Sequence, residues 1–131
     1  MRAYTLRVAR PVTNLDLSSE MYRAGLGLEI IGGFTDHQGF SGKMLGNPDL
    51  PWHLEFTVCH THPVKPLSTD EDLLVLYVPD QVEWERVCEQ MNAAGFAVVD
   101  AFNPYWAQLG KTFIDADGYR TVIQRQKWGS E

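Results

Sequence analysis

The strongest constraint on the fold is an internal repeat. The segment MYRAGLGLEIIGGF begins at Met21, and the similar segment MNAAGFAVVDAF begins at Met91. Met, Ala and Gly recur at corresponding places, and each segment lies where a predicted helix gives way to strand-like sequence. Each half of the chain therefore reads β-α-β-β-β, and neither half can cover both faces of its own sheet.

Start and stop signals place the two helices. Asn14 and Asp80 are preferred N-cap residues, and Gly25 and Gly95 are residues of a type that commonly ends a helix. The first helix is therefore expected between Asn14 and Gly25, and the second between Asp80 and Gly95. Apolar runs bounded by turn residues predict strands at residues 6–9, 28–31, 39–45, 52–57, 73–78, 97–101, 111–115 and 121–124.

Charge and composition exclude several classes of partner. The net charge of −6 at pH 7 opposes binding to nucleic acid and to anionic membranes. No apolar run approaches the roughly 20 residues of a membrane-spanning helix, and the N-terminal sequence has no signal-peptide core. Two cysteines do not suggest a disulfide framework. We therefore expect a cytoplasmic protein with no nucleic-acid or membrane partner.

Two further stretches, taken with the repeat, indicate a family. NLDLSSEMYRAGLGLE follows the first strand and FIDADGYRTVI ends the second half, and in this order and spacing they resemble the vicinal oxygen chelate superfamily. That superfamily includes glyoxalase I, extradiol dioxygenases, and fosfomycin and bleomycin resistance proteins. HLEFT and NPYW also resemble an uncharacterised bacterial subgroup of it. The resemblance covers residues 6–124.

The resemblance implies an α+β fold in which two βαβββ modules form a curved, partly open mixed β-barrel. The modules are expected at about residues 5–57 and 73–124, joined by a linker at residues 58–72, within a single domain of residues 1–131. Members of the superfamily often dimerise, so the resemblance also implies a homodimer. A small-molecule ligand is expected either inside each curved sheet or between subunits, depending on how the modules pair.

Metal-using members take one ligand from the first and last strand of each half. Carried over residue by residue, these positions fall on Arg7, Glu55, Leu73 and Val122, so Glu55 alone matches. A catalytic divalent ion needs about three protein ligands, and a guanidinium keeps its positive charge. We therefore expect no metal cofactor, with Arg7 and Glu55 forming a charge pair where the ion would lie.

Two alternatives stay open at this site. A one-residue shift of the first strand would point Arg10 rather than Arg7 inward. His53 and Glu55 alternate to the same face of the predicted strand, so with a loop histidine they could instead hold a divalent metal ion. The loop histidines available for this are His37, His60 and His62.

Aromatic residues suggest the walls of a ligand site. Pro104 prevents a continuous strand, so Tyr105 and Trp106 are expected on a loop. Trp52 could form the opposite wall, and aromatic rings suit a planar or cationic ligand. The residues expected to contact the ligand are His53, Trp52, His37, Asn103, Tyr105, Trp106 and Arg10.

Three functions are compatible with these expectations. The first is metal-independent binding of a small molecule, as in a resistance or sequestration factor. The second is a lyase or isomerase in which Glu55 acts as general base and Arg7 stabilises an enolate or oxyanion. The third is a metal-dependent lyase or dioxygenase with Glu55 and His53 as ligands. The charge pair weakens the second function, because it engages the carboxylate that would act as the base.

Overall fold

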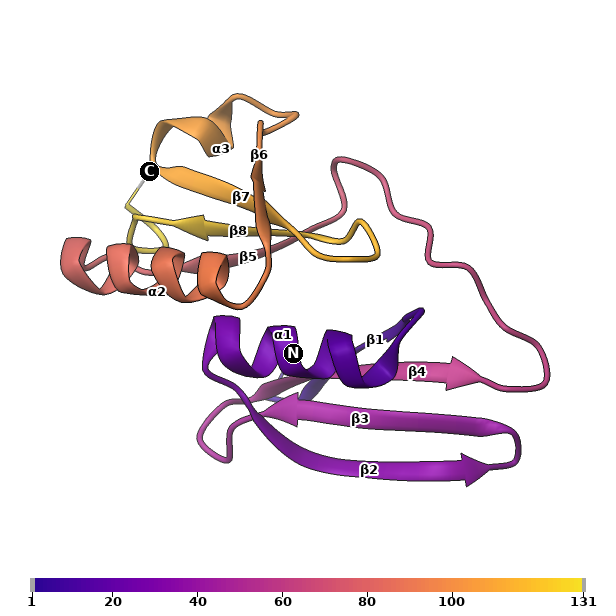
Figure 1. Ribbon diagram of the computed structural model, residues 1–131. Coiled ribbons are helices and arrows are strands. Elements are labelled where there is room, and N and C mark those ends of the chain that lie inside the picture. The colour runs from indigo at the N-terminus through magenta and orange to yellow at the C-terminus, as the bar shows by residue number, and fades with distance from the viewer. Residues whose placement is uncertain (1, 131) are drawn as a thin grey trace. The chain divides into compact units, whose positions relative to one another are not determined.

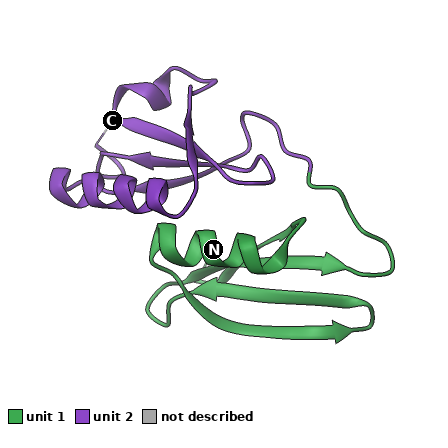
Figure 2. Cartoon of the chain, viewed as in Figure 1, with its two compact units in different colours: residues 1–66 green, residues 67–131 purple. Residues whose placement is uncertain are grey.

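The computed structural model describes residues 2–130 (Figure 1). The chain divides into two compact units, Met1–Pro66 and Leu67–Glu131 (Figure 2). Each unit contains one βαβββ module with its own four-stranded mixed sheet. The predicted α+β fold of two modules is confirmed, although the strands form two separate sheets and are not closed into a barrel. That the two modules act as one domain stays a prediction.

The first module repeats the predicted order of elements. It consists of β1 (Leu6–Pro11), α1 (Leu15–Leu26), β2 (Glu29–His37), β3 (Phe40–Gly46) and β4 (Trp52–Cys59). Its sheet has the strand order β1-β4-β3-β2, with β1 parallel to β4 and the other neighbours antiparallel. Helix α1 contacts β3 and β4 and lies along one face of the sheet (Figure 1). The other face carries the side chains of Arg7, His53 and Glu55.

Local chemistry sets both ends of α1. The Asn14 side chain accepts a hydrogen bond from the backbone N–H of Leu17 at 3.0 Å, as an N-cap residue does. The helix continues to Leu26, because Gly27 rather than the predicted Gly25 adopts the left-handed φ of 68° that ends it. Gly25 is instead one of the buried residues of the helix.

Alternation along β4 separates the core from the opposite face. Leu54 and Phe56 are 1% and 0% exposed, and the Tyr22 ring meets the Phe56 ring edge-on with centroids 4.8 Å apart. His53 and Glu55 point to the other side of the strand. Burying one such apolar side chain contributes about 1.5–3 kcal/mol of transfer free energy. One strand therefore supplies core residues on the side of α1 and two polar side chains on the opposite face of the sheet, which is called the open face below.

The second module repeats this arrangement around a different core. Its elements are β5 (Leu73–Tyr77), α2 (Gln81–Ala93), β6 (Ala97–Val99), α3 (Tyr105–Gln108), β7 (Gly110–Ile114) and β8 (Arg120–Gln124). The strand order is β5-β8-β7-β6, with β5 parallel to β8. Asp80 accepts a hydrogen bond from the backbone N–H of Glu83 at 2.9 Å and so caps α2. Phe113, Ile123 and Met91 are fully buried.

Helix α3 corrects the prediction that Tyr105 and Trp106 lie on a loop. Proline is compatible with the first turn of a helix, so Pro104 excludes a strand here but not a helical turn. The helix lies close to β7 because Gly110 has no side chain. A Cβ at Gly110 would lie 2.5 Å from Gln124 Oε1 and 2.7 Å from the Trp106 carbonyl oxygen.

Within residues 2–130, no helix has the length and apolar character needed to span a bilayer.

Candidate functional site

Arg7 joins His53 and Glu55 on the open face of the first sheet. β1 runs parallel to β4, with Arg7 opposite His53 and Ala9 opposite Glu55. The Arg7 Nε donates a hydrogen bond to His53 Nε2 at 2.9 Å, and the Arg7 Nη1 lies 3.3 Å from Glu55 Oε2. The Arg7 side chain is 46% exposed, whereas Glu55 is 13% exposed. Arg7 and Glu55 therefore form the ion pair expected from the sequence, and His53 is its third member.

These contacts restrict the chemistry of the cluster. His53 Nε2 accepts from a guanidinium, which has N–H donors and no acceptor. The Nε2 lone pair and one Glu55 oxygen are thus directed at Arg7. A ligand can still contact the half-exposed guanidinium, but a second cation at this place would meet a fixed positive charge.

The residues do not fit the four-ligand metal site of the superfamily. Leu73 occupies the β5 position that corresponds to Arg7, and Val122 occupies the β8 position that corresponds to Glu55. Neither hydrocarbon side chain offers a donor atom to a metal ion. Throughout the described chain, no three His, Cys, Asp or Glu side chains lie close enough together to hold a metal ion.

Arg10 and Trp52 lie on the opposite face of the sheet from Arg7 and Glu55. Arg10 is opposite Phe56 in the pairing of β1 with β4, so it alternates to the other face from Arg7. Trp52 alternates away from the face of Glu55 in the same way. Arg7 is therefore the arginine beside the carboxylate, and Trp52 does not form a wall next to this pair.

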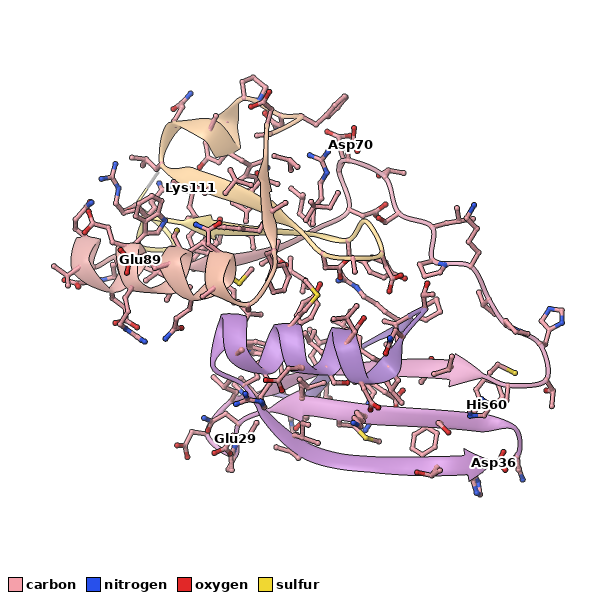
Figure 3. The ribbon with its side chains drawn as sticks, viewed as in Figure 1. Glu29, Asp36, His60, Asp70, Glu89 and Lys111 are labelled. Atoms are coloured by element: carbon pink, nitrogen blue, oxygen red, sulfur yellow. The ribbon has the colours of Figure 1, made fainter. Side chains whose placement is uncertain are left out.

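The β2–β3 hairpin engages His60 rather than His37. Asp36 and Gln38 have positive φ angles of 49° and 51°, which give a tight turn. The backbone N–H of Asp36 donates to Ser41 Oγ at 2.9 Å, and Ser41 Oγ lies 2.8 Å from His60 Nε2. Asp36 and His60 lie at the hairpin end of this sheet (Figure 3). His37 is exposed at the end of β2, so ligand contact by His37 stays a prediction.

A cavity of about 270 Å³ lies in the second module. Leu73 and Val75 of β5 contribute apolar side chains to it, and Asn103 and Trp106, both expected to contact a ligand, line it as well. The Tyr105 ring packs edge-on against Trp106 with centroids 4.9 Å apart. Of the aromatic residues expected to form a ligand wall, Trp106 lines this cavity, and Tyr105 contacts Trp106 without lining the cavity. That these rings contact a ligand stays a prediction.

Arg120 also lines this cavity, and the sequence reasoning missed it. Its side chain is 13% exposed and forms an ion pair with Asp70, with Nη2 and Oδ1 3.2 Å apart. The offset that relates Glu55 to Val122 also relates His53 to Arg120. Extending the repeat from the metal positions to the residues beside them would therefore have found this side chain.

The two cysteines lie in different environments. A hydrogen bond with the Thr61 hydroxyl, whose oxygen lies 3.5 Å from the sulfur, lowers the pKa of the Cys59 thiol. Burial in α2 raises the pKa of the Cys88 thiol. The Nε2 of the neighbouring His60 is bonded to Ser41, so a hydroxyl rather than an imidazole is the partner of the Cys59 sulfur.

Known proteins match both modules. The model of the YycE-like N-terminal domain matches residues 6–57, and the model of the YycE-like C-terminal domain matches residues 71–125. The uncharacterised protein YycE of Bacillus subtilis (strain 168) is 38% identical over 126 residues, which are 96% of this chain and 91% of YycE. The chain belongs to the YycE-like family.

Solved structures agree with the membership in the YycE-like family. The crystal structure of a YycE protein of unknown function from Bacillus subtilis matches with a TM-score of 0.89, covering 98% of this chain and 93% of that one, at 38% identity. The fosfomycin resistance protein FosX of Mesorhizobium loti matches with a TM-score of 0.70, covering 93% and 90%, at 10% identity. TnmS3, an antibiotic binding protein from Streptomyces sp. CB03234, matches with a TM-score of 0.64, covering 95% of each chain, at 18% identity.

The two more distant structures show the fold alone. Together with the family match, they confirm that this YycE-like chain has the vicinal oxygen chelate fold that its repeat and motifs predict. The fold does not determine the activity, because members of one fold carry different sites.

Proposed function

We propose that the protein binds a small molecule without a metal ion and serves as a resistance or sequestration factor. The observation that carries the proposal is the Arg7 guanidinium, which donates to His53 and lies against Glu55 where metal-using relatives are expected to hold their ion. This fixed charge opposes a divalent cation at the same place. It also engages one of the two Glu55 oxygens, so less of the carboxylate is available to act as a general base.

Two fold relatives support the class of function. FosX is a fosfomycin resistance protein and TnmS3 is an antibiotic binding protein, so this fold carries both kinds of role. The polar cluster on the first sheet and the aromatic cavity of the second module give this chain two surfaces for a ligand.

Metal content is the first test. Untagged protein incubated with Mg²⁺, Mn²⁺, Fe²⁺, Ni²⁺ or Zn²⁺ and then desalted is expected to retain less than about 0.1 ion per chain, because a stable site needs about three ligands. Elemental analysis measures this, with the Glu55→Gln variant as control. Near-stoichiometric metal that disappears in Glu55→Gln would contradict the proposal.

Thermal stabilisation and recovery of the ligand distinguish a binding protein from an enzyme. A bound ligand is expected to raise the melting temperature, by a stabilisation of about 2.7 kcal/mol at 100 times its Kd, and to be recovered chemically unchanged. Consumption of the ligand would instead support the lyase or isomerase with Glu55 as base. In that case Glu55→Gln would abolish turnover while leaving the fold intact.

We also propose a homodimer. Ile31 and Phe40 of the first module expose 46% and 44% of their surfaces, which is apolar area that a second chain could cover. Sedimentation equilibrium tests this assembly, and a monomer throughout the micromolar range would contradict it.

A further inference from the structure

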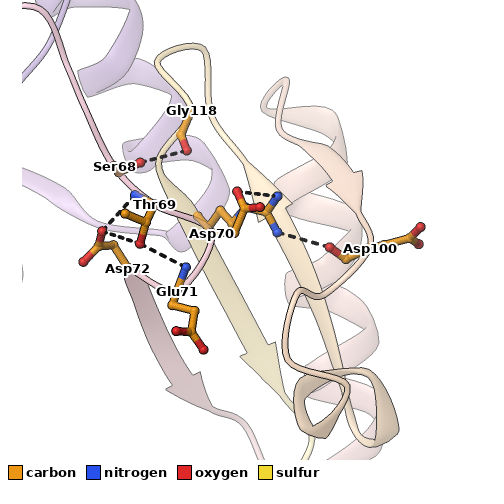
Figure 4. Close-up of polar contacts among 8 residues, drawn as sticks. Ser68, Thr69, Asp70, Glu71, Asp72, Asp100 and Gly118 are labelled. Atoms are coloured by element: carbon orange, nitrogen blue, oxygen red, sulfur yellow. Dashed lines mark hydrogen bonds and ion pairs between the residues drawn. The ribbon is translucent and has the colours of Figure 1, made fainter.

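The cavity of the second module has a basic side chain among its lining residues. Arg120 is 13% exposed, and its Nη1 donates a hydrogen bond to the Asp100 carbonyl oxygen at 3.1 Å (Figure 4). Its Nη2 lies 3.2 Å from Oδ1 of Asp70, a residue of the linker whose side chain is 60% exposed. These two contacts engage two of the five N–H donors of the guanidinium.

A second donor is buried in the same lining. Thr112 lines the cavity and is 3% exposed, and its hydroxyl has no hydrogen-bond partner among residues 2–130. A buried polar group without a partner is costly, so a ligand atom that accepts from it is favoured. The two carboxylates of the lining, Asp70 and Glu71, are instead on the exposed linker. The Arg120 guanidinium can only donate and the Thr112 hydroxyl can donate, so a ligand atom that accepts hydrogen bonds would satisfy both groups.

The rest of the lining is suited to a flat hydrocarbon body. Leu73 and Val75 provide aliphatic surface, and Phe102 and Trp106 provide aromatic rings. The volume of about 270 Å³ is just below the range of roughly 300–1,000 Å³ that is typical for drug-sized ligands. A compound with one ring therefore fits the size of the cavity.

We propose that this cavity binds a small aromatic carboxylate, which takes the place of the Asp70 carboxylate on Arg120. The ligand carboxylate bridges the guanidinium and the Thr112 hydroxyl, and the ring contacts Leu73, Val75 and Trp106. A carboxylate that accepts from both the Arg120 guanidinium and the Thr112 hydroxyl makes two contacts in the cavity, whereas the Asp70 carboxylate makes one ion-pair contact with Arg120. This inference deepens the proposed function, because it rests on the chain being a small-molecule binder and adds the ligand class and its place.

The linker is built so that Asp70 can be exchanged without unfolding. The backbone N–H and the hydroxyl of Thr69 both donate to Asp72 Oδ2 at 2.8 Å, and Ser68 Oγ donates to the Gly118 carbonyl oxygen at 3.2 Å (Figure 4). These bonds fix the turn on both sides of Asp70 and do not use its side chain. Rotation of one exposed side chain is then sufficient to release Arg120.

Benzoate is the probe that tests this site. Binding to the full chain is measured by isothermal titration and by amide chemical shifts, in buffer that contains EDTA. Benzamide, a neutral analogue, and benzylamine, a cationic one, are the ligand controls. Benzoate is expected to bind at least about tenfold more tightly than either analogue, which corresponds to about 1.4 kcal/mol.

Three variants assign the binding to the cavity. Asp70→Asn removes the competing carboxylate and is expected to strengthen benzoate binding by roughly three- to tenfold, since the released pair is an exposed one. Arg120→Gln is expected to weaken it at least about tenfold, and Thr112→Val about threefold, as partners of the ligand carboxylate are lost. Arg86→Gln, on the exposed surface of α2, removes an arginine away from the cavity and is expected to change nothing.

Several outcomes would overturn the inference. Tighter binding of benzylamine than of benzoate would make the cavity a cation site, and weaker benzoate binding in Asp70→Asn would exclude the exchange. If Arg120→Gln does not fold, Asp70→Asn and Thr112→Val still decide the question. Because the benzoate titration is done in EDTA, its result does not depend on whether the protein binds a metal ion. Metal retained in the separate elemental analysis would therefore contradict the proposed function but not the benzoate site.

Discussion

Replacement of Phe56 by alanine is expected to lower the free energy of unfolding by about 3–5 kcal/mol, the usual cost of removing a buried aromatic ring. Phe56 is 0% exposed at the centre of the first module, and its ring contacts Tyr22 edge-on with centroids 4.8 Å apart. Strand β4 is hydrogen-bonded on both sides, by β1 and by β3, so the backbone cannot close the cavity easily.

Urea denaturation followed by circular dichroism measures this loss. Leu17→Ala is the control, because Leu17 is on helix α1 of the same module but is 46% exposed and lies outside the apolar area proposed for the dimer. The control is expected to cost less than about 1 kcal/mol, as surface substitutions generally do. Equal losses in the two variants would mean that the core of this module does not lie on the helix side of β4.

Substitution of Arg7 by histidine is expected to convert the cluster on the first sheet into a metal site. The Arg7 guanidinium contacts both the His53 Nε2 and a Glu55 oxygen, so an imidazole at this position comes near the same two groups. Arg7→His removes the fixed charge and supplies a third ligand, which is the number a zinc site with an open position uses. Retention of about one Zn²⁺ per chain after desalting is the expected result.

Arg7→Leu is the control for this experiment. It removes the positive charge without adding a donor atom, so it is expected to retain no zinc. Elemental analysis with and without EDTA gives the result, and circular dichroism shows that both variants fold. About one Zn²⁺ per chain in Arg7→Leu as well as in Arg7→His would show that the charge, and not the missing ligand, excludes the metal. No zinc in Arg7→His would contradict the prediction.

Much of the fold could be predicted because the repeat and the alternation of side chains are local signals. Met21 and Met91 mark corresponding helices, and the alternation of His53 and Glu55 with Leu54 and Phe56 gives the two faces of β4. Cap residues are equally local, which is why Asn14 and Asp80 were identified as helix starts. The end of α1 was missed by two residues, since two glycines compete there and the sequence does not state which one takes a positive φ.

The site was predicted where it depends on the family resemblance and missed where it depends on the linker. The pairing of Arg7 with Glu55 follows from the ligand positions of the resembled superfamily, which fall on two strands that lie side by side. The ion pair of Arg120 with Asp70 joins a strand to an irregular segment, and no periodic pattern reports such a contact. The turn of α3 was missed for a related reason: it is four residues long, too short for a helical period to appear.

The alternation along β4 has a consequence for how this family can diverge. Gain or loss of one residue within the strand would turn Phe56 outward and carry Glu55 into the apolar interior, because every side chain beyond the change switches face. Mutational drift in this strand is therefore confined to point substitutions, whereas loops elsewhere tolerate changes in length. The spacing of His53 and Glu55 is therefore maintained even without selection for ligand binding. A change in this spacing would also disrupt the packing of the core.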